Sequence, residues 1–294
     1  MELVRNTIKF LMHLPCMKLK YLFIMLKLLV KVENSLFPIN KEKVKQHSKS
    51  QSYLYKVNKN EQSQRLVLLL HGGAYEGGFC FVYKILSNLI RSLSKYDVAS
   101  LDYRVTPNVF PAALDDALEA YKFYSLMYQE IIVIGDSAGG NLTLALGLKL
   151  QQLNFKMPLK MVLLSPWTDM TASGDSYRQN MYKDHLFGVS SRLSYSEELM
   201  QNIVPKGYSQ GADLRNPLLS PKFAEYKKFC PVLIQVGGDE CLLDDSVVVY
   251  EKLKKVTDAR MHVFDGMFHV FQCLFPGSPE GKVAWKEIAE FLKE

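Results

Sequence analysis

The sequence predicts an α/β protein with a mostly parallel central sheet flanked by helices. Short, continuous apolar runs such as residues 66–70 and 131–134 indicate buried strands. Strand-like and helix-like segments alternate along the chain, which implies right-handed crossovers and parallel strand pairing. A hydrophobic fraction of 48% suits a large core, and 294 residues suit one large domain with an insertion or two small domains.

The elements are expected in a regular order. Residues 52–57 alternate between polar and apolar side chains, as in a half-buried strand, and give the sheet a short antiparallel start. Further strands are expected at residues 66–70, 98–101, 131–134, 160–164, 232–236 and 261–264, and helices at 79–95, 110–127, 142–146, 244–256 and 280–293. Between residue 165 and about residue 229, prolines, aromatics and polar residues mix, which indicates an inserted lid rather than sheet.

Charge is distributed unevenly along the chain. Residues 1–60 contain 12 Lys and Arg against three Glu, whereas the remainder contains 24 Lys and Arg against 27 acidic residues. The net charge of +6 of the whole chain therefore comes from the N-terminal segment. The mildly acidic body argues against a nucleic-acid partner.

The five cysteines are scattered along the chain: Cys16, Cys80, Cys230, Cys241 and Cys273. They show neither a Cys-x-x-Cys motif nor the Cys/His spacing of a metal site, so neither a zinc ion nor a disulfide framework is expected. This usage favours a reducing, cytoplasmic location.

Residues 19–32 form an apolar stretch that Lys20, Lys27 and Lys31 interrupt. Its longest uncharged run, residues 21–26, is too short for a membrane span, and no small-residue cleavage site follows it. The lysines fall at helical spacing opposite Leu and Phe side chains, which predicts an amphipathic basic helix. Two roles stay open: packing on the main domain as part of a cap, which we favour, or weak contact with an anionic membrane surface.

Residues 135–139 form a Gly-x-Ser-x-Gly motif between a predicted strand and a predicted helix. This is the context of a nucleophile elbow, in which the serine stands at the tip of a sharp turn. Gly135 and Gly139 then occupy places where a side chain would collide with the strand or the helix. Ser137 is therefore the candidate nucleophile, and the N–H of Ala138 is expected to face the carbonyl oxygen that Ser137 attacks.

A serine hydroxyl needs a base to take its proton, and the base needs an acidic partner that holds it in the right tautomer. In an elbow-type fold the order along the chain is serine, acid, histidine, each on a loop after a strand. Of the six histidines, His269 is the one that follows the last predicted strand.

The acidic partner should follow the preceding strand, residues 232–236. Asp239 then stands at the tip of this strand and is the candidate catalytic acid. Glu240, Asp244 and Asp245 are its rivals. The last two open the next helix, where capping and the helix dipole explain an acidic residue.

The glycine-rich loop that begins at His71 is a second source of oxyanion donors. We expect the N–H groups of Gly73 and Ala74 to join that of Ala138 in an oxyanion hole. The loop lacks the Lys-Ser/Thr and Gly-x-Gly-x-x-Gly patterns of phosphate sites. His71 and Gly72 are expected to shape the loop, with His71 acting as a structural hydrogen-bonding residue rather than a metal ligand.

Together these residues resemble the hormone-sensitive-lipase-like family of α/β-hydrolases over roughly residues 65–290. His71-Gly72-Gly73-Ala74 is similar to the family's His-Gly-Gly-Gly oxyanion loop, and residues 135–140 resemble its elbow. Residues 102–112 are similar to its Asp-Tyr-Arg…Phe-Pro-Ala stretch. Two departures stand out: Ala74 replaces the last glycine, which is harmless if its φ stays negative, and Asn108 replaces the usual glutamate.

The resemblance implies an α/β-hydrolase fold with a helical cap, built from residues 1–50 and an insertion at about 166–225 of the catalytic domain 51–294. It also implies a serine carboxylesterase or lipase that takes a small-molecule ester, here of short to medium chain length, with no cofactor and no metal. An amide hydrolase of the deacetylase or formamidase type and a catalytically silent binding protein remain alternatives, although the presence of His269 speaks against the second. The sequence leaves a homodimer open.

Overall fold

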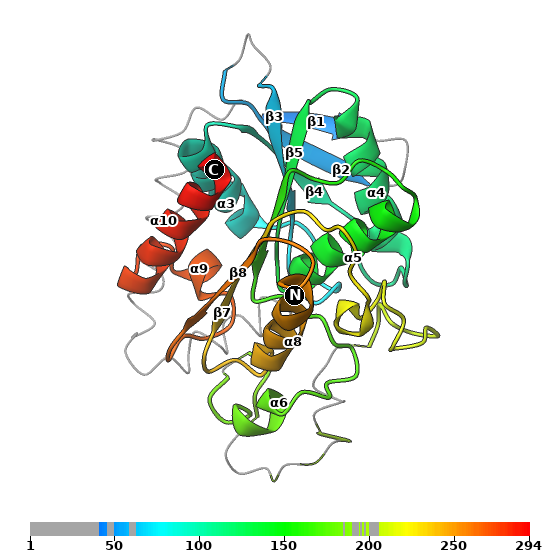
Figure 1. The fold of residues 1–294 in the computed structure, drawn as a ribbon, viewed down its shortest axis with the longest axis vertical. Helices are drawn as coiled ribbons and strands as arrows, with labels where there is room; N and C mark the ends of the chain where they lie inside the picture. Colours follow the sequence, from blue (N-terminus) through cyan, green and yellow to red (C-terminus); the bar gives the residue numbers. More distant parts are fainter. Residues whose placement is uncertain are drawn as a thin grey trace. The chain divides into compact units, whose positions relative to one another are not determined.

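An eight-stranded sheet forms the centre of the part of the chain that the computed structural model describes (Figure 1). That part comprises residues 41–45, 50–58, 63–184, 186–189, 194, 196, 198–199 and 206–294. In spatial order the strands are β1 (Lys41–Lys45), β2 (Gln51–Tyr55), β4 (Asp97–Asp102), β3 (Arg65–Leu70), β5 (Glu130–Asp136), β6 (Lys160–Leu164), β7 (Val232–Gly237) and β8 (Ala259–Phe264).

The pairing of the strands confirms the predicted α/β class. β2 pairs antiparallel with both β1 and β4, whereas all other neighbours in the sheet pair in parallel. Every residue of β6 and β7 is buried, as the continuous apolar runs predict for strands covered on both faces. The strand β1 was not predicted, because its sequence KEKVK is dominated by lysine and glutamate.

Helices cover both faces of the sheet. Figure 1 places α3 (Phe81–Ser94), α9 (Phe271–Leu274) and α10 (Pro279–Lys293) on one face, and α4 (Ala112–Ser125), α5 (Ala138–Gln152) and α8 (Leu243–Leu253) on the other. Four of these helices lie close to their predicted bounds, α5 extends beyond the predicted residues 142–146 at both ends, and the short α9 was not predicted. Helix α5 is buried almost throughout, so its start beside the carboxyl end of β5 is fixed by packing.

The segment between β6 and β7 contains no strand among its described residues. These residues include α6 (Ser176–Gln179), the 3₁₀ helix η1 (Pro221–Phe223) and several turns, as the mixed composition predicts for an insertion. The assignment of this segment as a cap together with the N-terminal segment stays a prediction, but the predicted boundary of the N-terminal segment at residue 50 is wrong, because residues 41–45 form strand β1 of the central sheet. The amphipathic helix expected at residues 19–32 lies outside the described residues. Nowhere in the described segments does a helix reach the length and hydropathy that a membrane crossing needs.

Candidate active site

Ser137 lies in the sharp turn that joins β5 to α5. Its φ of +54° and ψ of −118° belong to a sparsely populated region, which is typical of the nucleophile in an elbow. A Cβ at Gly135 would lie 2.1 Å from the carbonyl oxygen of Gly139, and one at Gly139 would lie 2.0 Å from that of Leu70. Only glycine fits at both positions, so the motif is required by the close approach of strand, turn and helix.

The imidazole of His269 lies beside this serine. Its Nε2 is 3.0 Å from the Oγ of Ser137, and its ring is almost fully buried on the loop that follows β8. The ring of Phe187 packs against it in an edge-on arrangement, with the centroids 4.9 Å apart. The structure thus brings together the two residues that the motif and the chain order singled out.

The acidic group that contacts His269 is Glu240, and the prediction that this group is Asp239 is wrong. The Oε2 of Glu240 lies 2.7 Å from the Nδ1 of His269, and the Glu240 side chain is fully buried. Asp239 instead lies 3.5 Å from the Nζ of Lys183, with a third of its side chain exposed. Glu240 is one of the rivals that the sequence offers for this role.

The turn at the end of β7 explains the shift by one residue. β7 continues through Gly237, one residue beyond its predicted end. The N–H of Gly237 then donates to the Oε1 of Glu240 (2.5 Å), while the N–H of Asp239 donates to the carbonyl of Met267 (3.1 Å). A Cβ at Gly237 would lie 2.2 Å from that same carbonyl. The compact turn therefore directs residue 240 inward toward the imidazole and leaves residue 239 at the surface.

Ser165, the first residue after β6, links the acid to the histidine loop. Its Oγ donates to the Oε1 of Glu240 (2.7 Å) and accepts from the N–H of Val270 (3.1 Å). Each of the adjacent parallel strands β5 to β8 thus supplies one member of the site at its carboxyl end. In the sequence Ser165 marked only the start of the insertion, and no local pattern identified it.

Burial alone would lower the pKa of His269, because an apolar environment disfavours the imidazolium. The charge and the hydrogen bond of Glu240 outweigh this effect, and the charges of Asp184 and Asp136 add to them. The pKa of His269 is therefore raised above 6.5. The pocket is thus arranged to stabilise the protonated imidazole that forms when a serine proton is taken up.

This raised pKa gives a prediction for the pH dependence of the reaction. His269 accepts a proton only when it is neutral, so kcat/KM should fall as the pH drops through its pKa, with a midpoint above 6.5. A series of kcat/KM measurements on a neutral ester from about pH 5 to about pH 9 checks it. The rate at which a fluorophosphonate labels Ser137 should show the same limb, and a midpoint well below 6.5 would contradict the assignment.

The predicted oxyanion loop has an unexpected backbone. Gly73 has a φ of +111°, and Ala74 follows with a φ of +56°, so the condition under which the alanine would be harmless, a negative φ, is not met. The carbonyl of Gly73 accepts from the N–H groups of Glu76 and Gly77, and this tight turn imposes the left-handed conformation on the alanine. Across the described residues, no hydrogen bond uses the N–H of Gly73, Ala74 or Ala138.

His71 and Gly72 connect this loop to the elbow. The Nδ1–H of His71 donates to the carbonyl of Gly72 (2.8 Å), and burial lowers the pKa of His71 to about 4, so its ring is neutral. The N–H of Gly72 donates to Asp136, the neighbour of Ser137 (3.1 Å). Burial raises the pKa of Asp136 to about 6.

Within the described ranges, no cluster of three or more His, Cys, Asp or Glu side chains could hold a metal ion.

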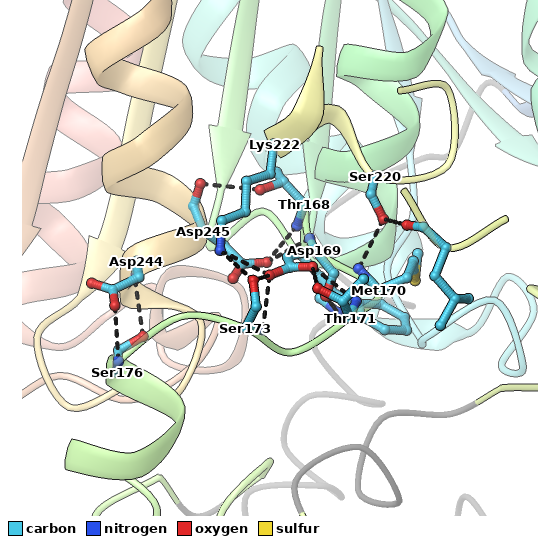
Figure 2. A network of polar contacts seen from close by, with 12 residues as sticks. Thr168, Asp169, Met170, Thr171, Ser173, Ser176, Ser220, Lys222, Asp244 and Asp245 are labelled. Carbon is cyan, nitrogen blue, oxygen red and sulfur yellow. Dashed lines mark hydrogen bonds and ion pairs between the residues drawn. The ribbon is translucent and has the colours of Figure 1, made fainter. Parts of the chain in front are cut away.

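Asp244 and Asp245 lie in the first turn of α8, where the helix dipole favours acidic residues, but neither caps the helix, so the capping part of the sequence interpretation is wrong. The helix begins after Leu242 without a capping side-chain hydrogen bond. Figure 2 shows both carboxylates turned toward the segment after β6. Asp245 accepts from the N–H groups of Thr168 (2.7 Å) and Asp169 (2.8 Å), and Asp244 accepts from that of Ser176 (2.9 Å). They hold the start of the insertion against α8, away from His269.

Comparisons with known proteins identify the family of this chain. A family model described as alpha/beta hydrolase fold matches residues 67–273. An esterase of Acinetobacter venetianus is 31% identical over 241 residues, 80% of this chain and 77% of its own. An acetyl-hydrolase of Streptomyces hygroscopicus is 32% identical over 244 residues, 81% and 78% of the two chains. The crystal structure of an esterase from the bacterial hormone-sensitive lipase family superposes with a TM-score of 0.77 and 31% identity, covering 90% of this chain and 89% of that one.

Proposed function

Because this chain belongs to the hormone-sensitive-lipase-like family of α/β-hydrolases, we propose that it is a serine carboxylesterase for short- to medium-chain esters, working through an acyl-enzyme intermediate. The observation that carries the proposal is the unbroken chain of hydrogen bonds from Glu240 through His269 to Ser137. The relatives named esterase and acetyl-hydrolase support a small-molecule ester as the substrate.

In the acylation step, the Nε2 of His269 takes the proton of the Ser137 hydroxyl as its oxygen bonds to the ester carbonyl carbon. When the tetrahedral intermediate collapses, His269 returns this proton to the leaving alcohol oxygen, and the acyl group stays on Ser137. In the second half, His269 deprotonates a water whose oxygen bonds to the acyl carbon. When this second tetrahedral intermediate collapses, the bond from the acyl carbon to the Ser137 Oγ breaks, His269 returns the proton to that Oγ, and the acid is released. Glu240 stays ionised throughout, holds the Nδ1–H and stabilises the imidazolium.

The negative oxygen of each tetrahedral intermediate needs donors that are in place before the charge develops. We assign this role to the backbone N–H groups of Gly73, Ala74 and Ala138, which the described part of the chain leaves free of internal hydrogen bonds. Ala138 is also the first residue of α5, where the helix dipole favours negative charge. The carboxylate of Asp136 helps to hold the oxyanion loop in place, because it accepts a hydrogen bond from the N–H of Gly72.

The two alternative functions differ from this one in testable ways. An amide hydrolase would use the same three residues, so only its substrate preference separates it from an esterase. A silent binding protein is disfavoured by the contact between His269 and Ser137. We also propose a cytoplasmic location, because scattered cysteines without a motif spacing are typical of a reducing compartment.

We expect kcat/KM to peak at short to medium acyl chains. Trp167 and Phe187 are buried next to the candidate triad and give the site an apolar wall. The backbone N–H of Trp167 donates to the carbonyl of Ser137 (3.1 Å). Each buried methylene of an acyl chain adds about 0.8 kcal/mol until the pocket ends, after which longer chains clash. A series of p-nitrophenyl esters from acetyl to palmitoyl measures this profile.

Two comparisons make the result decisive. The anilide of the preferred acyl group should be hydrolysed far more slowly than its ester, and the reverse order would favour the amide-hydrolase alternative. Labelling by a fluorophosphonate should add its mass to the peptide that contains Ser137. An intact protein that neither takes the label nor hydrolyses any ester of the series would refute the proposed function.

A further inference from the structure

We propose that Asp184 is a positioning residue of the triad, which holds Glu240 and Phe187 in place around His269 from the segment between β6 and β7. This inference rests on the proposed function, since it concerns the same three catalytic groups. It adds a second buried carboxylate to the site, one that touches neither the substrate nor the reacting atoms.

The carboxylate of Asp184 joins two separate stretches of backbone. Its Oδ2 accepts from the N–H of Cys241 at 2.7 Å. Its Oδ1 accepts from the N–H groups of Leu186 (2.8 Å) and Phe187 (3.0 Å). Only 3% of Asp184 is exposed, so these charge-assisted hydrogen bonds form away from water, where they restrain geometry most.

The first of these stretches carries the catalytic acid. Cys241 directly follows Glu240, so its anchored N–H fixes the backbone from which the glutamate side chain projects. The same insertion holds the turn at a second place, because the Nδ2 of Asn180 donates to the carbonyls of Gly238 (3.0 Å) and Glu240 (2.9 Å). Asp184 and Asn180 together hold the backbone of the turn that directs Glu240 toward the imidazole.

The second stretch carries the aromatic ring that covers the histidine. Phe187 is 6% exposed, and its ring meets that of His269 edge-on at 4.9 Å. The N–H of Phe187 is one of the groups bound by Asp184. The ring shields one side of the imidazole from water and limits its rotation. The carboxylate of Asp184 therefore helps to position both Glu240, the hydrogen-bond partner of His269, and Phe187, the aromatic ring that packs on it.

The negative charge of Asp184 also acts on His269 directly. The charged groups that face the imidazole are Glu240 from the loop after β7, Asp184 from the insertion and Asp136 from the elbow. The ion pair of Lys183 with Asp239 lies at the surface of the same loop. Asp184 raises the pKa of His269, so removal of its charge should lower that pKa and weaken the imidazolium formed during the reaction.

The variant Asp184→Asn tests this role. Its amide nitrogen cannot accept a hydrogen bond, so one of the two stretches loses its anchor, and the negative charge is lost as well. We expect kcat to fall by roughly ten- to a hundredfold, KM to change less, and the acid limb of kcat/KM to move to lower pH.

Asp97→Asn provides the matched control. Asp97 is a fully buried aspartate at the start of β4, and its carboxylate accepts from the backbone N–H groups of Val57 (2.8 Å) and Ser63 (3.4 Å). The substitution therefore removes a comparable charge and comparable hydrogen bonds far from the carboxyl ends of the strands. It should lower the melting temperature and leave the acid limb where it is.

The outcomes separate the inference from the proposed function. A wild-type protein without esterase activity would refute the proposed function. A folded, active Asp184→Asn protein with wild-type kcat and an unmoved acid limb would refute the role of Asp184 alone. If Asp184→Asn does not fold, Asp184→Glu decides: the charge is kept, so the acid limb should stay, while the displaced N–H partners should lower kcat. A wild-type kcat in that variant would overturn the inference.

Discussion

Replacement of Ser137 by alanine is expected to lower kcat/KM for ester hydrolysis by roughly 10⁴- to 10⁶-fold while the protein stays folded. The Oγ of Ser137 is the atom that would bond to the acyl carbon, and it lies 3.0 Å from the only imidazole nitrogen placed to take its proton among the described residues. The substitution removes one oxygen from an elbow that otherwise keeps its glycines and its backbone. Steady-state kinetics and thermal unfolding of the variant check both parts of this expectation.

Ser100→Ala is a suitable control for this experiment. Ser100 is also a buried serine, on β4, and its Oγ lies 2.6 Å from that of Ser87 instead of a histidine. The control should keep the full activity at a somewhat reduced melting temperature. A Ser137→Ala protein that retains most of its activity would remove the basis of the acyl-enzyme mechanism.

The second large effect is expected at Glu240. In Glu240→Gln, an amide nitrogen must face either the Nδ1–H of His269 or the donors Ser165 and Gly237, so the hydrogen bonds that set the tautomer of the imidazole cannot all form. The loss in kcat could reach the order of 10⁴, as is seen when a triad carboxylate becomes an amide. Measurement of kcat with the preferred ester tests it.

Asp239→Asn is the matched comparison, because it changes the adjacent carboxylate in the same way. Asp239 is partly exposed and pairs with Lys183 at 3.5 Å, an interaction worth about 0–1 kcal/mol at a surface. Its replacement should leave kcat close to that of the wild type. If Asp239→Asn were the damaging change and Glu240→Gln the mild one, the hydrogen bond of Glu240 to His269 would not be the one used in catalysis.

Much of the architecture could be predicted from the sequence, because the relevant signals are local. Apolar runs identified the parallel strands, and the Gly-x-Ser-x-Gly motif identified the elbow, whose glycines are required by contacts within a few residues and with β3. The order of the three catalytic groups along the chain identified His269. The polar strand β1 and the one-turn helix α9 gave no such signal and were missed.

The details that sequence reasoning missed depend on contacts between distant segments. Whether residue 239 or 240 turns inward is decided by a compact turn that packs against the carbonyl of Met267, some 30 residues further along the chain. The positive φ of Ala74 is the exception, because it follows from a local turn around the carbonyl of Gly73. The bonds of Ser165 and Asp184 with the acid loop span 75 and 57 residues, so no periodicity could reveal them.

The placement of the site at the ends of four adjacent strands has a consequence for how the protein becomes active during folding. Ser137 and His269 are 132 residues apart in the chain, and Ser165 and Glu240 lie on the loops that follow β6 and β7, the two strands between β5 and β8 in the sheet. A partly assembled chain that lacks β8 can be collapsed and rich in secondary structure and still hold no base next to its nucleophile. Catalytic competence therefore requires β8 to be in register with β7, and the appearance of activity reports the assembly of β5 to β8 rather than the collapse of the chain.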